Sequence, residues 1–106
     1  MTVRELPEKL PLDLLEQEED RAITGVFCCD LLSVAMAKAP EDSAWVTVIG
    51  NANTVAVATL ADVACIVIAE GYSFDDSAVS AAKGKVALLR SDKPAYETAV
   101  SIGQLL

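Results

Sequence analysis

Few residues in this chain are suited to catalysis. The sequence contains 16 acidic residues and three cysteines but no histidine. Without histidine, neither a Ser-His-Asp triad nor a Cys-His pair can form. The patterns GxGxxG and GxxxxGK[ST] are also missing, and a phosphoryl-transfer enzyme needs such a phosphate cradle. We therefore expect a protein that is not an enzyme. An enzyme that uses carboxylates or a thiol is kept as a less favoured hypothesis.

The three cysteines, Cys28, Cys29 and Cys65, are predicted to be buried apolar thiols. Their odd number and the lack of CxxC spacing argue against a disulfide framework. Asp30 beside the pair opposes formation of a reactive thiolate. Three ligands are too few for a structural zinc site, and the acids show no EF-hand spacing. No metal or cofactor is predicted, and a metal shared across a dimer is the alternative.

Polar residues follow the predicted strands and form the candidate binding site. In an open α/β sheet, ligands bind at the carboxyl ends of the strands. The proposed ligand-binding residues there are Asp30, Gly50, Asn51, Asn53, Thr54, Glu70 and Gly71, with Ser91 and Asp92 at the same edge. The loop 50–54 leads into a helix, whose first N–H groups could receive an anion. Helix capping by Asn53 and a turn at Gly50 explain the same residues without a ligand.

The elements that must position these residues are strands alternating with helices. Near-continuous apolar runs at 45–49, 63–69 and 85–89 are typical of parallel strands buried on both faces. Further strands are predicted at 12–15, as an edge strand, and at 23–29. Helices are predicted at 2–10, 31–38, 53–61, 76–83 and 93–104. The expected fold is one domain over residues 1–106, a three-layer α/β/α structure with a small, mostly parallel sheet.

Particular residues are expected to begin the helices or to face the core. Thr2 and Glu5 match a capping box. Asp30 is predicted to cap the helix at 31–38. In the last helix, Tyr96, Ala99 and Val100 are expected to face the core.

The charge of the chain excludes some partners. The formal net charge is −8, with 16 acidic and 8 basic residues. Binding of nucleic acid or of an anionic membrane relies on clustered Lys and Arg, which this sequence lacks. No apolar run is long enough for a membrane span, and the first residues do not look like a signal peptide. These observations predict a cytoplasmic protein that binds neither nucleic acid nor membrane.

From Asp20 onward, the chain resembles the DRTGG domain family. The name-giving segment is altered, with Asp20-Arg21 followed by Ala22-Ile23 and then Thr24-Gly25, and with Val26 in place of a second glycine. Further similar positions are Asp30-Leu31-Leu32-Ser33, Met36, Trp45-Val46-Thr47, Asn53, Val55-Ala56-Val57-Ala58 and Cys65-Ile66-Val67-Ile68.

The resemblance implies a fold and a class of function. Members of the family are similar to the non-catalytic N-terminal domain of HPr kinase/phosphorylase. They occur inside longer enzymes, or as small proteins that are in some cases encoded beside iron-only hydrogenases. The family therefore implies a regulatory or interaction module that forms a homodimer and modulates or helps assemble a partner enzyme. The alternative is a sensor domain for a small ligand or a nucleotide.

Overall fold

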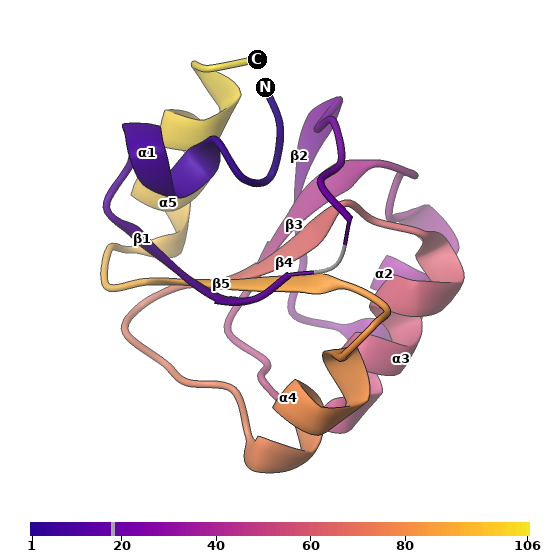
Figure 1. The fold of residues 1–106 in the computed structure, drawn as a ribbon. Coiled ribbons are helices and arrows are strands. Elements are labelled where there is room, and N and C mark those ends of the chain that lie inside the picture. Colours follow the sequence, from indigo (N-terminus) through magenta and orange to yellow (C-terminus); the bar gives the residue numbers. More distant parts are fainter. Residues whose placement is uncertain (18) are drawn as a thin grey trace.

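A computed structural model describes residues 1–17 and 19–106 of the chain. In these residues, five strands form one sheet in the order β1-β5-β4-β3-β2 (Figure 1). The strands are β1 (Leu12–Glu16), β2 (Gly25–Cys28), β3 (Ser43–Thr47), β4 (Cys65–Ile68) and β5 (Ala87–Ser91). The predicted edge strand at 12–15 is thereby confirmed as β1, and the three apolar runs form the centre of the sheet.

The sheet is mixed, so the prediction of a mostly parallel sheet needs correction. Strands β2, β3, β4 and β5 run parallel to their neighbours, whereas β1 pairs antiparallel with β5. Parallel neighbours need a long crossover connection between them. Strand β1 precedes the first strand–helix unit, so no crossover determines its direction.

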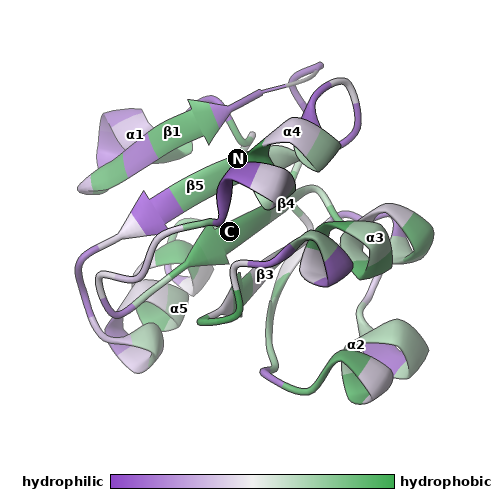
Figure 2. Ribbon diagram, turned by 90° about the horizontal axis from the view of Figure 1, so that it is seen from below, coloured by the Kyte–Doolittle hydropathy of each residue, from purple (hydrophilic) through white to green (hydrophobic). Residues whose placement is uncertain are grey.

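The helices cover the two faces of the sheet unequally. They are α1 (Leu6–Lys9), α2 (Leu32–Lys38), α3 (Ala52–Ala61), α4 (Asp76–Ala82) and α5 (Ala95–Gly103). Strands β2 to β5 follow one another across the sheet in chain order. Because crossovers of one hand then turn to the same side, α2, α3 and α4 share one face. Helices α1 and α5 lie on the other face (Figures 1 and 2).

Each central strand sends alternate side chains into two separate cores. Trp45 and Ile66 pack with residues of α2, α3 and α4. Val46 and Val67 pack instead with residues of α1 and α5, including Ile102. All five of these side chains are buried, because helices cover both faces of β3 and β4.

Several helices begin later than predicted. The helix expected over 2–10 is reduced to α1, and Thr2 donates its backbone N–H to the Glu5 carboxylate at 3.1 Å, which is half of a capping box. The side chain of Asp30 does not cap α2. In α5, Ala99 packs against the core as predicted, but the prediction for Tyr96 and Val100 is wrong, since both are exposed and Ile102 is buried.

Arg21 connects the loops that lead into β3 and β4. Its guanidinium donates hydrogen bonds to the carboxylates of Asp42 and Asp62, and to the backbone carbonyls of Asp62 and Val63 at 3.0 and 3.1 Å. Both aspartates have a left-handed backbone, with φ of 62° and 58°. Burial acts to lower the pKa of Arg21, but the two carboxylates outweigh it and raise that pKa. Arg21 thus stabilises two turns whose backbone is unfavourable for residues other than glycine.

Arg21→Gln is expected to lower the free energy of unfolding by about 1–3 kcal/mol, because it removes hydrogen bonds to charged and carbonyl oxygens. The measurement is urea unfolding. The matched control is Arg4→Gln, because the hydrogen bond of the exposed Arg4 guanidinium to Gln17, within residues 1–17 and 19–106, is long, at 3.4 Å. Equal stability losses in the two variants would contradict a structural role of Arg21.

Candidate functional site

The predicted binding residues lie at the carboxyl ends of the strands, but they form separate hydrogen-bonded groups. One group links β2 to β3. The Asp30 carboxylate accepts hydrogen bonds from the Thr47 hydroxyl at 2.8 Å and from the backbone N–H of Val48 at 2.9 Å. Asp30 therefore holds the end of β3 beside the end of β2.

A second group begins helix α3. The side-chain oxygen of Asn51 accepts bonds from the N–H of Thr54 at 3.0 Å and from its hydroxyl at 3.3 Å. Asn51, not Asn53, is therefore the capping residue. Thr54 is buried and Asn53 is exposed on the first turn. The interpretation that an asparagine of this loop caps the helix is therefore confirmed, with Asn51 in the role that was predicted for Asn53.

Gly50 lies beneath the loop that follows β4. A Cβ atom at Gly50 would be 2.6 Å from the carbonyl oxygen of Ser73 and 2.8 Å from Cδ1 of Ile68. The Gly50 carbonyl also accepts a hydrogen bond from the N–H of Asp75 at 2.7 Å. Glycine is needed here because another backbone approaches closely.

The third group joins the end of β4 to β5 and α5. Glu70 and Gly71 both have a left-handed backbone, with φ of 61° and 74°. The Glu70 carboxylate accepts a bond at 2.7 Å from the N–H of Ala95, the first residue of α5. The Gly71 carbonyl accepts one at 2.9 Å from Arg90. Glu70 thus caps a helix that is distant in sequence, which no local pattern could indicate.

The strand order explains why loop 50–54 does not line a crevice. Crevices open where successive loops leave the sheet on opposite faces. The loops after β2, β3 and β4 all lead to the α2–α4 face, and only the loop after β5 leads to the opposite face. The two sides separate at the end of β5, which lies two strands away from β3, the strand that loop 50–54 follows.

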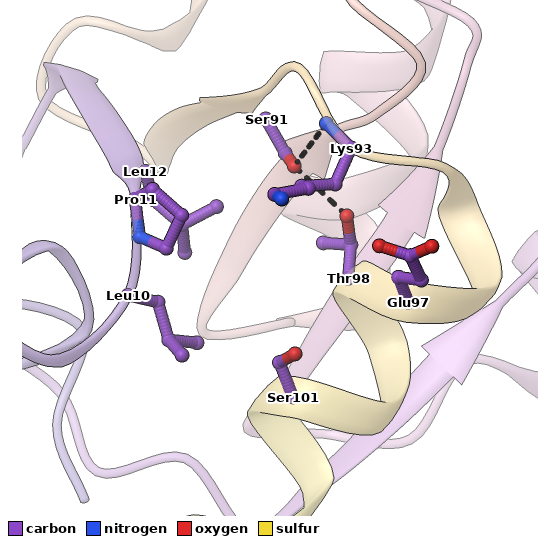
Figure 3. A pocket seen from close by; sticks show the side chains of 8 residues that line it. All are labelled: Leu10, Pro11, Leu12, Ser91, Lys93, Glu97, Thr98 and Ser101. Atoms are coloured by element: carbon purple, nitrogen blue, oxygen red, sulfur yellow. Dashed lines mark hydrogen bonds between the residues drawn. The ribbon is translucent and has the colours of Figure 1, made fainter.

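A cavity of about 140 Å³ lies beside the end of β5. Its lining comes from the start of β1 and the segment before it, from the end of β5 and the loop after it, and from α5 (Figure 3). The lining residues are Leu10, Pro11, Leu12, Ser91, Lys93, Glu97, Thr98 and Ser101. Ser91 was placed at this edge from the sequence, but the other lining residues were missed. Segments far apart in sequence meet there, so no spacing pattern could have identified them.

A second hollow, of about 300 Å³, is a groove between α3 and α4. Its lining is mostly apolar and small, and consists of Ala52, Val55, Ala56, Thr59, Leu60, Ala81 and Lys85. Leu60 is 75% exposed. The groove therefore has a large, mostly exposed apolar side chain at its wall.

The cysteines differ in burial, so the prediction of three buried thiols is wrong in part. Cys65 is buried in β4, whereas Cys28 is exposed and Cys29 is half-buried. Burial raises the pKa of the Cys28 thiol, and the Asp30 carboxylate raises it further. A raised pKa opposes thiolate chemistry. Among residues 1–17 and 19–106, no group of three or more Cys, Asp or Glu side chains is arranged to hold a metal ion.

In comparisons with known proteins, no family model and no curated protein matches this chain. The resemblance to DRTGG domains stays a prediction. In the described part of the chain, no helix is long and apolar enough to cross a membrane.

Gly50→Ala is expected to destabilise the protein by about 1–3 kcal/mol, because the new methyl group overlaps backbone atoms that cannot move independently. The control is Gly103→Ala, since a Cβ at Gly103 meets nothing within 4 Å. Alanine suits a helix better than glycine, so the control should be neutral or stabilising. If both variants unfold at the same urea concentration as the parent protein, the packing of the 73–75 loop on Gly50 is incorrect.

The Cys65 thiol should make stability fall at alkaline pH. Burial raises its pKa to about 12 from an ordinary 9.0, although the charge of Arg21 acts in the opposite direction. Above pH 9 the unfolded chain loses this proton while the folded chain keeps it, so the free energy of unfolding decreases as the pH rises. The slope is at most about 1.4 kcal/mol per pH unit. Urea unfolding of the reduced protein at several pH values, compared with Cys65→Ala, measures this contribution. Equal slopes of the unfolding free energy against pH in the parent protein and in Cys65→Ala would contradict burial of the thiol.

Proposed function

We propose that this chain is a non-catalytic regulatory or interaction module that works as a homodimer and modulates or helps assemble a partner enzyme. The observation that carries the proposal is the apolar character of the α2–α3–α4 face. Helices α2, α3 and α4 have seven, ten and seven residues, and among these only Lys38 and Asp76 are charged. Helix α3 has no charged residue, although one of its sides is exposed.

Such a face is unusual on the surface of an acidic protein. A surface helix normally has charged or polar residues opposite its buried side, and a helix that is apolar all round is normally covered. Leu31 at the start of α2, Met36 within it, and Leu60 at the end of α3 are 60%, 57% and 75% exposed. Large exposed apolar side chains on neighbouring helices of one face favour an interaction surface there.

A second copy of the chain suits this face. A two-fold dimer needs a surface that is complementary to itself. The α3–α4 groove offers a shallow apolar hollow lined by Ala52, Ala56 and Ala81, and exposed Leu60 lies at its wall. In a two-fold arrangement, Leu60 of each copy would enter the groove of the other.

Charge also favours contact at this face. Each copy has a net charge of −8, so two copies repel each other where their acidic surfaces meet. The charge-poor helical face is the region where this repulsion is weakest. Charged residues are also depleted from the centres of protein interfaces, because removing them from water is costly.

The family resemblance extends the proposal to a biological role. A DRTGG-like domain with the three-layer order of the HPr kinase N-terminal domain would act in the cytoplasm on a partner enzyme, with hydrogenase-associated proteins as one candidate class. Self-association through α2–α4 would leave α5 and the end of β5 accessible. The alternative role, as a small-ligand sensor, is supported by the cavity at that end.

Leu60→Glu is expected to convert the dimer to a monomer, because it places a charge in the apolar contact. The dimer dissociation constant should rise at least about 30-fold, the effect of losing a hot-spot side chain. Light scattering coupled to gel filtration over a range of protein concentrations measures the change, and circular dichroism verifies that the variant is folded.

Tyr96→Glu is the matched control, because Tyr96 is 78% exposed on α5 at the opposite face of the sheet. It should leave the dimer intact. A parent protein that is monomeric at every concentration would overturn the homodimer. Dissociation by Tyr96→Glu but not by Leu60→Glu would place the interface on α5 and contradict the α2–α4 face.

A further inference from the structure

We propose that the cavity at the end of β5 binds a small α-amino acid in its zwitterionic form. This site goes beyond the proposed function, because it lies on the opposite side of the sheet from the α2–α4 face and does not require a dimer. Its walls differ in chemistry. Leu10, Pro11 and Leu12 form an apolar wall, and it faces a polar wall from the end of β5 and from α5 (Figure 3).

The polar wall contains a hydroxyl pair with an unused donor. Ser91 and Thr98 are 1% and 4% exposed, and their hydroxyl oxygens are 2.8 Å apart. Ser91 also accepts a bond from the N–H of Lys93 at 3.1 Å. The pair has two hydroxyl protons, and only one can lie between the two oxygens. Among the described residues, the other proton has no acceptor, so a ligand oxygen in the cavity would supply one.

Two opposite charges border the same cavity. Lys93 and Glu97 both line it, and neither forms a salt bridge with a residue that the structure describes. A ligand carboxylate can pair with the Lys93 ammonium and accept the free hydroxyl proton. A ligand ammonium can pair with Glu97. The apolar wall then contacts an aliphatic side chain, as expected for a pocket in which a few polar groups set the orientation.

The surroundings favour a zwitterion over a simple anion. Glu70 lies at the start of α5, where its carboxylate accepts the N–H of Ala95. Together with Glu97 and the net charge of −8, this acid disfavours a ligand that has only negative charge. The cavity volume of about 140 Å³ corresponds to about five water molecules, which suits a small aliphatic amino acid and excludes a nucleotide.

The test is calorimetric titration of the full chain with alanine, valine and serine. Isobutyrate and isopropylamine serve as probes that have only one of the two charges. We expect saturable binding of at least one of the three amino acids and at least about tenfold weaker binding of both single-charge probes, since each loses a charge-assisted hydrogen bond. No binding of any amino acid at millimolar concentration overturns the proposal. Equal binding of isobutyrate overturns the zwitterion as the ligand class.

Variants locate the site. Lys93→Gln and Glu97→Gln change exposed side chains, so the fold should persist, and each should weaken amino-acid binding at least about tenfold. Lys83→Gln is the matched control, because Lys83 is an exposed lysine after α4 and does not line the cavity. Unchanged affinity in Lys93→Gln and Glu97→Gln overturns the placement. Leu60→Glu should bind the amino acid like the parent protein, so failure of the dimer and failure of this site are distinguishable.

Discussion

Burial of the central strands on both faces is the constraint on which the rest of the structure depends. Strands β3, β4 and β5 contain mostly apolar side chains, and these alternate between two cores. An uncovered face would expose a row of such side chains to water, at about 25 cal/mol for each Å² of apolar surface. Helices must therefore cover both faces. Because β2 to β5 follow in chain order, the crossover helices all lie on one face, and α5 with α1 must cover the other.

This arrangement determines how the polar residues at the strand ends are used. Asp30 bonds to the end of the next strand, Asn51 caps the following helix, and Glu70 caps α5. The Asp30 and Glu70 interactions each join one βα loop to its neighbour, whereas Asn51 acts within its own loop. The carboxyl edge is therefore held by side chains that were predicted to bind a ligand. Polar groups at such an edge can bind a ligand only where the structure leaves them without internal partners. The cavity beside Ser91 and Thr98 is such a place.

The two proposed activities lie on opposite faces for the same reason. Three short helices side by side cover the β2–β5 face, and their outer sides lack the charges that the rest of this acidic chain carries. The other face is covered by α5 and α1, and the chain crosses to it after β5. A dimer contact on α2–α4 would leave the cavity at the start of α5 open to a small molecule.

The sequence by itself determined the central strands and most helices, because hydrophobic runs and their spacing depend on local chain chemistry. It also indicated Gly50 as a special turn position. Only the tertiary structure decided that Glu70 caps α5, that Tyr96 is exposed, and that Leu10 meets Ser91 at one cavity. Those relations depend on which face each crossover takes and on where β1 pairs. Strand order is set by long-range packing between segments that no short pattern connects.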